Sequence, residues 1–212
     1  MKNRVLILAN KLPYPSDDGS SIAMARLLET LLMKELDLHY FAINSHKHCK
    51  DVEISNAYQP IVNFEAFEWN TSPKVSTAIK NLATSLPYHV SRFYIPTLQK
   101  RLDAFKPDSF HTVILEGAFM GMYLKEARRI GKQTILRAHN VEHEIWKRLA
   151  ENEENPLKRW YLKLQSRRLQ NFESQLSDAV DKIWCISEKD QQWFKSITSA
   201  ASFIPTAVIP IP

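Results

Sequence analysis

Glycine is scarce in this sequence, and its scarcity excludes one common kind of nucleotide site. The chain has 212 residues and only four glycines: Gly19, Gly117, Gly121 and Gly131. A dinucleotide-binding fingerprint needs three closely spaced glycines directly after the first strand of the fold. That spacing does not occur here, so we predict no dinucleotide cofactor.

Cysteine and long apolar runs are scarce too. Cys49 and Cys185 are far apart and form no CxxC pair, so neither a disulfide framework nor a four-ligand zinc site is predicted. The first apolar run, residues 5–9, is too short for a signal peptide and far too short to span a membrane. We therefore expect a cytoplasmic protein that binds no metal and no cofactor.

The composition is that of a soluble globular protein with a basic surface. Apolar residues make up 44% of the chain, charged residues 24%, and the formal net charge is +5. A basic surface suits nucleic acid, an anionic membrane or a phosphorylated ligand. Since the chain has no basic tail and no nucleic-acid-binding motif, we do not expect nucleic acid as a partner.

Short apolar runs alternate with amphipathic segments, which predicts an α/β protein with a doubly wound, mostly parallel sheet. The predicted strands are residues 5–9, 36–43, 61–69, 112–115, 134–138, 182–186 and 202–205. The predicted helices are residues 20–32, 73–86, 96–105, 141–151, 156–179 and 188–197, with a further helix that ends near residue 130 and is closed by Gly131.

The chain ends in a proline-rich segment that suggests a domain boundary. Residues 207–212 form an extended stub that we predict to have nothing to pack against. We assign residues 1–205 to one domain and residues 206–212 to the start of a linker. A second domain would then follow outside this sequence.

Polar residues follow several of the predicted strands. Glu116, His139 and Ser187 each come directly after a strand, and the loop after the first strand leads to Gly19. Ligands of open α/β sheets bind in the crevice beyond the carboxyl ends of the strands. We therefore expect these four positions to lie along one edge of a single sheet and to form the functional site.

Each of these residues also has an ordinary structural interpretation. Asp18-Gly19-Ser20 leads into a helix, whose free amides suit a phosphate or a hydroxyl group, but a turn with a serine N-cap would look the same. His139 can act in the crevice or bond to backbone, with Asn140 as N-cap of the next helix.

The other two strand-end residues have similar alternatives. The Glu116 carboxylate can bind a ligand or cap the helix that follows it. Ser187, with Asp190 three residues later, is typical of a capping box.

Two further patterns suggest other functions. His139 to His143 matches the H-x-x-E-H pattern of a class of zinc peptidases, which needs both histidines on one continuous helix; the strand that runs up to His139 argues against it. Arg159, Lys163 and Arg167 recur every four residues on the long predicted helix. This basic face is typical of a solvated helix surface, and peripheral contact with a membrane is the alternative.

The sequence resembles the N-terminal domain of the family-4 (group 1) retaining glycosyltransferases of GT-B fold. The resemblance extends over the whole chain and is carried by the order and spacing of four segments. These are residues 7–20 (ILANKLPYPSDDGS), 86–93 (LPYHVSRF), 137–142 (RAHNVE) and 184–190 (WCISEKD). The family usually has two adjacent glycines in the first loop, where this chain has Gly19 and Ser20.

The resemblance implies two Rossmann-like domains that face a cleft, of which this chain is the first. It implies transfer of a sugar from a nucleotide-sugar donor, bound mainly by the C-terminal domain, to a glycan or lipid-linked acceptor, with retention. His139 is then a catalytic residue near the transferred sugar. Substrate-binding positions are implied for Asp18, Gly19, Ser20, Glu116, Asn140, Glu142 and Ser187.

The resemblance also implies that this chain alone transfers no sugar, because the donor-binding residues of the family lie in the other domain. A stand-alone α/β ligand-binding module and the zinc peptidase remain the alternative hypotheses.

Overall fold

A computed structural model of the chain describes residues 2–16, 18–45, 63–197 and 206–208. These residues form one seven-stranded sheet, in the order β3-β2-β1-β4-β5-β6-β7, in which every neighbouring pair is parallel. The strands are β1 (Asn3–Ala9), β2 (Leu36–Ser45), β3 (Asn63–Trp69), β4 (Phe110–Glu116), β5 (Gly131–Ala138), β6 (Lys182–Cys185) and β7 (Thr206–Val208).

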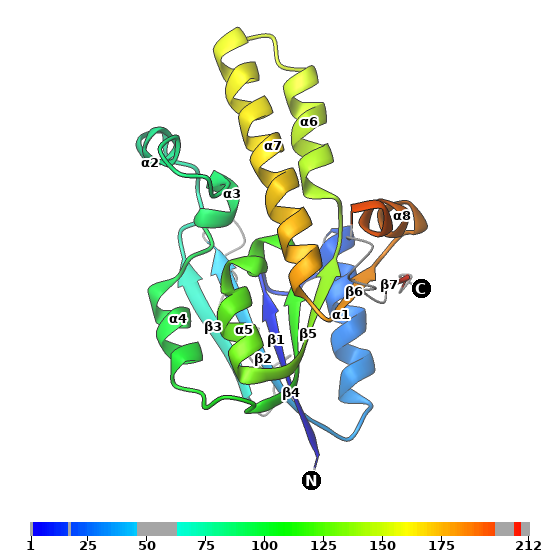
Figure 1. The fold of residues 1–212 in the computed structure, drawn as a ribbon. Coiled ribbons are helices and arrows are strands. Elements are labelled where there is room, and N and C mark those ends of the chain that lie inside the picture. The colour runs from blue at the N-terminus through cyan, green and yellow to red at the C-terminus, as the bar shows by residue number, and fades with distance from the viewer. Residues whose placement is uncertain (1, 17, 46–62, 198–205, 209–212) are drawn as a thin grey trace.

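The helices lie on both faces of this sheet and beyond its carboxyl edge (Figure 1). They are α1 (Gly19–Leu32), α2 (Val75–Asn81), α3 (Tyr88–Ser91), α4 (Pro96–Asp103), the 3-10 helix η3 (Ala118–Tyr123), α5 (Leu124–Ile130), α6 (Glu142–Glu151), α7 (Pro156–Ala179) and α8 (Glu188–Ile197). The chain builds outward from β1 to β3 and then from β4 to β7. The predicted doubly wound, Rossmann-like α/β fold is therefore confirmed.

The period-two alternation of β1 divides the hydrophobic core into two layers. Leu6 and Leu8 belong to the layer that includes residues of α4, α5 and α8. Val5 and Ile7 belong to the opposite layer, where α1 covers the sheet. Because both faces are buried, the central strands contain mostly apolar residues, which is the pattern that predicted them.

Several predicted boundaries are confirmed and others are corrected. Helix α7 has the predicted limits, whereas the helix predicted over residues 73–86 is only α2, because the Asn81 side chain bonds to Thr84 and to the Leu86 carbonyl and closes it. Gly131 is the C-cap of α5, which ends at Ile130 as predicted, but its backbone is extended (φ −111°) rather than left-handed, and it opens β5. A Cβ on Gly131 would lie 2.7 Å from a Val113 methyl group, which explains the glycine.

The C-terminal segment is the second correction. Thr206–Val208 form β7 and pair with β6, so these residues belong to the sheet, and the prediction of an unpacked stub is wrong for Ala207 and Val208. The strand predicted at 202–205 and the residues 209–212 lie outside the described residues.

Helices α6 and α7 form a hairpin that rises beyond the carboxyl edge of the sheet (Figure 1). Helix α7 buries only part of its apolar residues: Leu169 and Leu176 are buried, but Leu157 is 73% exposed. The buried face includes Gln165, whose side chain accepts from the Tyr88 amide at 2.8 Å, and Glu173. Tertiary hydrogen bonds thus decide which face of α7 is buried. No described helix has both the length and the apolar character needed to cross a bilayer.

Candidate functional site

The carboxyl edge of the sheet holds a buried cluster of charged side chains. Glu116 ends β4, Arg137 lies beside it in register on β5, and His139 follows β5. Arg137 Nη1 lies 3.1 Å from Glu116 Oε1, and His139 Nε2 lies 2.6 Å from Oε2. All three residues are at most 5% exposed. The predicted meeting of Glu116 and His139 at one edge is therefore confirmed as geometry.

Arg137 is the member of this cluster that the sequence interpretation missed. Its Nη2 donates to the Ala23 carbonyl of α1 at 2.9 Å, which ties the strand to the helix. The sequence could have indicated Arg137, which lies within an otherwise apolar predicted strand. A buried guanidinium needs a buried partner, so such an arginine points to an acid nearby. Glu116 does not cap the following helix, since its carboxylate is engaged by Arg137 and His139.

Burial by itself would raise the pKa of Glu116, but the Arg137 guanidinium and the hydrogen bond from His139 outweigh it and hold the pKa below its ordinary value. The carboxylate is thus ionised and can only accept, so His139 Nε2 carries the hydrogen that it donates. The other ring nitrogen of His139, Nδ1, is buried and has no hydrogen-bond partner. Glu116 therefore fixes both the tautomer and the orientation of the imidazole.

The loop after β1 departs from the prediction. The N-cap of α1 is Asp18 rather than a serine: its carboxylate accepts from the Ser21 amide at 2.9 Å and from the Ser20 hydroxyl at 2.8 Å. Lys11 Nζ lies 2.6 Å from the same carboxylate. Burial opposes ionisation of Asp18, but Lys11 and these donors hold its pKa well below its ordinary value.

The first-turn amides of α1 are therefore not an empty anion pocket, because Asp18 already binds there. A Cβ on Gly19 would meet nothing within 4 Å, so packing does not demand a glycine at this position.

The start of α6 is held by a residue from another helix. The N-cap position is Val141, which offers no side-chain cap, so the predicted N-cap role of Asn140 is wrong. Instead the buried Glu173 carboxylate of α7 accepts from the Glu142 amide at 2.7 Å and from His143 Nδ1 at 2.8 Å. A carboxylate is the favoured partner at a helix N-terminus, where the dipole is positive.

This arrangement bears on the zinc-peptidase hypothesis. His139 lies before α6 and binds Glu116, whereas His143 lies within α6 and binds Glu173. The two histidines are thus not on one continuous helix. Across the described ranges, no group of three histidine, cysteine or acidic side chains could hold a metal ion.

Glu142 has a strongly perturbed carboxyl group. Burial and the negative charge of Glu173 raise its pKa to about 7, although a hydrogen bond from Asn140 acts in the opposite direction. A carboxyl group with this pKa exchanges protons near neutral pH, which makes Glu142 a candidate for hydrogen bonding to a ligand in either protonation state.

Ser187 lies after β6 and caps the N-terminus of α8. Its hydroxyl donates to the Asp190 carboxylate at 2.6 Å and accepts from the Asp190 amide at 3.2 Å. The predicted capping role of Ser187 is confirmed, and this pairing engages its hydroxyl.

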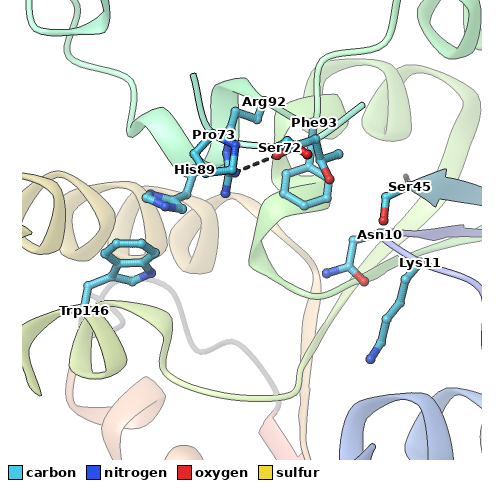
Figure 2. A pocket seen from close by; sticks show the side chains of 10 residues that line it. Asn10, Lys11, Ser45, Ser72, Pro73, His89, Arg92, Phe93 and Trp146 are labelled. Carbon is cyan, nitrogen blue, oxygen red and sulfur yellow. Dashed lines mark hydrogen bonds between the residues drawn. The ribbon is translucent and has the colours of Figure 1, made fainter. Parts of the chain in front are cut away.

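A cavity of about 460 Å³ lies at the carboxyl ends of β1 and β2, close to the point where the strand order reverses between β1 and β4. In open α/β sheets this switch point is where ligands bind. Figure 2 shows His89 and Trp146 at one end of the cavity and Asn10 and Lys11 at the other. The described lining residues are Asn10, Lys11, Ser45, Thr71, Ser72, Pro73, His89, Arg92, Phe93 and Trp146.

Three polar atoms of this lining are buried and have no hydrogen-bond partner: Asn10 Oδ1, His89 Nδ1 and Arg92 Nε. Buried polar atoms are nearly always paired in folded proteins, so unpaired ones around a cavity indicate a polar occupant. The sequence interpretation singled out none of these three as site residues. His89 and Arg92 lie in the segment 86–93 and Asn10 lies in the segment 7–20, and all three contributed only to the family resemblance.

Arg159, Lys163 and Arg167 of α7 are exposed, as expected for a solvated face. Arg159 Nε donates to the Glu153 carbonyl at 2.7 Å. Lys163 and Arg167 line a groove of about 430 Å³ between α6 and α7, together with Lys147.

Comparison with known proteins adds information on the fold alone. No protein-family profile and no curated protein matches this sequence. Solved structures that resemble the fold include two that are each 14% identical to this sequence. They are the N-terminal domain of Candida albicans trehalose-6-phosphate phosphatase, with a TM-score of 0.50, and TcCGT1 in complex with UDP, with a TM-score of 0.49.

The match covers 99% and 100% of this chain, respectively, but only 48% and 51% of the two neighbours. The chain thus spans about half the length of each.

Proposed function

We propose that this chain is the acceptor-side half of a glycosyltransferase of GT-B fold, the N-terminal domain of a retaining enzyme of family 4. This proposal rests on the cavity at the switch point of the sheet. The cavity is lined by polar atoms without hydrogen-bond partners and by the aromatic ring of Trp146. A sugar presents both hydroxyl groups and apolar C–H faces, and this lining offers donors, acceptors and an aromatic ring. We take the domain to be residues 1–205 together with Thr206–Val208, which pair with β6 as β7.

In this proposal the acceptor, a glycan or a lipid-linked glycan, binds in the cavity against Trp146 and His89. His139 contacts the transferred sugar, and the Glu116 carboxylate positions its imidazole. Gly19 and Ser20 border the donor side of the cleft, and Glu142 hydrogen-bonds to a sugar hydroxyl. Asn140 and Ser187, which also follow strands at this edge, complete the proposed rim.

The nucleotide-sugar donor would bind mainly to a second domain that follows this sequence. Basic side chains and amides of that domain would stabilise the leaving diphosphate. We expect the chain to act in the cytoplasm and, taken alone, to be inactive.

The proposal is tested by assaying transfer of isotope-labelled sugar from nucleotide-sugars, with residues 1–212 and with the product of the complete reading frame. We expect transfer by the longer protein only. In that protein Trp146→Ala should raise the KM for the acceptor, whereas Leu149→Ala, a change at an exposed position one turn along α6, should not.

Robust transfer by residues 1–212 alone would contradict the proposal. A reading frame that stops at Pro212 would instead favour a stand-alone ligand-binding module.

Peripheral contact with a membrane is a second part of the proposal, and a different surface supports it. An apolar groove of about 470 Å³ lies between α2 and the first turns of α7, lined in part by Val75, Ile79, Leu157 and Trp160, all of them more than half exposed. Lys158 also lines the groove, and Lys74, Lys80, Arg159 and Lys163 are exposed on the same two segments. Apolar and aromatic side chains edged by cations suit an anionic lipid surface.

Sedimentation with phospholipid vesicles tests this contact. We expect the chain to bind vesicles that contain phosphatidylglycerol, and salt or the double change Leu157→Ser and Trp160→Ser should weaken binding. Met33→Ser, at an exposed position on the far end of α1, serves as the control. Equal binding to pure phosphatidylcholine, or a dimer that buries the groove, would refute the contact.

A further inference from the structure

The described residues that line the cavity at the switch point include basic side chains but no acidic ones. They include Lys11 and Arg92, and none of them is an aspartate or a glutamate. The Lys11 ammonium is already paired with the Asp18 carboxylate of α1. Arg92 therefore supplies the uncompensated positive charge of the cavity.

Arg92 is held in place by groups that leave its charge unpaired. Its Nη1 donates to the Thr71 carbonyl at 2.6 Å, and its guanidinium lies over the Tyr88 ring at 5.4 Å. Its Nε is buried and has no hydrogen-bond partner. Among the residues that the structure describes, no carboxylate forms an ion pair with it. A half-buried guanidinium without a counter-ion costs folding free energy, because its charge is partly desolvated. A bound anionic partner offsets that cost.

The neighbouring histidine does not share this positive charge. His89 is 7% exposed, and its ring centroid lies 3.5 Å from that of Trp146. Burial, assisted by the charge of Arg92, lowers the pKa of His89 to about 3, so the imidazole is neutral at neutral pH. Its unpaired Nδ1 is thus a neutral hydrogen-bonding group beside a single fixed cation.

From this lining we infer that the ligand of the cavity carries an anionic group, a carboxylate or a phosphate, that pairs with the Arg92 guanidinium. The inference rests on the proposed function in that the ligand is taken to be the sugar acceptor. The acceptor is then an acidic glycan or a sugar phosphate rather than a neutral sugar. An arginine suits both anions, since its planar fork of N–H donors matches carboxylate and phosphate oxygens.

The experiment compares ligands that differ only in the anionic group. Glucose, glucuronate, glucose 6-phosphate and inorganic phosphate are titrated into the chain, and the dissociation constants are measured by calorimetry or by ligand-detected NMR. We expect one of the two acidic sugars to bind roughly tenfold or more tightly than glucose, as a charge-assisted hydrogen bond provides. If glucuronate binds more tightly, the anion is a carboxylate; if glucose 6-phosphate binds more tightly, it is a phosphate.

Substitutions of Arg92, with a control at Arg168, connect the preference to Arg92. Arg92→Gln should remove the difference between the acidic sugar and glucose. Arg168→Gln is the matched control, because Arg168 also donates to backbone carbonyls, those of Asn81 and Leu82, but does not line the cavity. If Arg92→Gln fails to fold, Arg92→Lys should keep part of the preference, since it retains the charge without Nε and the planar fork.

Several outcomes would overturn the inference. Glucose and the acidic sugars could bind equally well, inorganic phosphate could bind as tightly as glucose 6-phosphate, or none of the four probes could bind. Equal binding that is lost in Trp146→Ala would leave the proposed acceptor site standing without its charge preference. An Arg92-dependent preference in a protein whose complete form transfers no sugar would keep the inference and remove the proposed function.

Discussion

Replacing Glu116 by glutamine tests whether the buried cluster at the edge of the sheet holds the fold together. The substitution keeps the shape of the side chain and removes its charge. Arg137, which is 2% exposed, then keeps its positive charge without a carboxylate partner. Breaking a buried ion pair from one side costs about 3–5 kcal/mol, because the remaining charge stays desolvated. We therefore expect Glu116→Gln to lower the free energy of unfolding by about 3 kcal/mol or more at neutral pH.

The chain contains a matched control for this prediction. Glu65 accepts from Arg101 Nε at 2.8 Å, with similar chemistry, but the two side chains are 35% and 39% exposed. Exposed ion pairs contribute only ~0–1 kcal/mol, so Glu65→Gln should change stability by no more than that. Urea denaturation of both variants, followed by circular dichroism, measures the two values.

The pH dependence gives a second readout of the same substitution. The pKa of Glu116 is lower in the folded chain than its ordinary value of 4.5, so its ionisation stabilises the fold above that value. This contribution is lost as the pH falls through the folded pKa, and the stability difference between wild type and Glu116→Gln should shrink accordingly. The reasoning is refuted if Glu116→Gln costs no more than Glu65→Gln at neutral pH.

Three further predictions concern positions close to the site. The pKa of Glu142 is raised to about 7, so between about pH 4.5 and 7 the folded chain holds a proton that the unfolded chain releases. The free energy of unfolding of the wild type should therefore fall as pH rises through this range. Glu142→Gln should abolish this fall in urea titrations across the same range. Gly117 has φ 86° and ψ 156°, a conformation open mainly to glycine, so Gly117→Ala should cost about 1–3 kcal/mol; an unchanged urea midpoint would contradict this. Gly131→Ala should cost about 1–3 kcal/mol by overpacking, since its Cβ would meet Val113 at 2.7 Å, and pairing it with Val113→Ala should recover part of the loss in a double-mutant cycle.

Most of the fold could be predicted because its signals are local. The apolar runs of the central strands and the amphipathic pattern of α7 are readable in short windows of sequence. The errors fell where a particular side-chain bond or a neighbouring strand overrides the pattern of apolar residues. Asn81 ends α2 through its side chain, and β7 exists because β6 offers an edge on which Thr206–Val208 can pair.

The candidate site could be predicted in part. Glu116 and His139 were found because they follow strands, and parallel strands deliver their carboxyl ends to one edge. Arg92 and Trp146 come from helices outside the sheet, so strand order gives no indication of them. Their place in the cavity depends on how α3 and the α6–α7 hairpin pack against each other.

The alternation of strands and helices, and with it the edge of the sheet where polar residues gather, follows from the local sequence pattern, because backbone hydrogen bonding and burial of apolar side chains act over short stretches of chain. Which charges meet depends on how the chain packs. Glu116 binds Arg137 and His139, Glu173 caps α6 from another helix, and Arg92 is left without an acid among the described residues. Such pairings join residues up to about 30 positions apart, and they form only when the packed chain removes both partners from water.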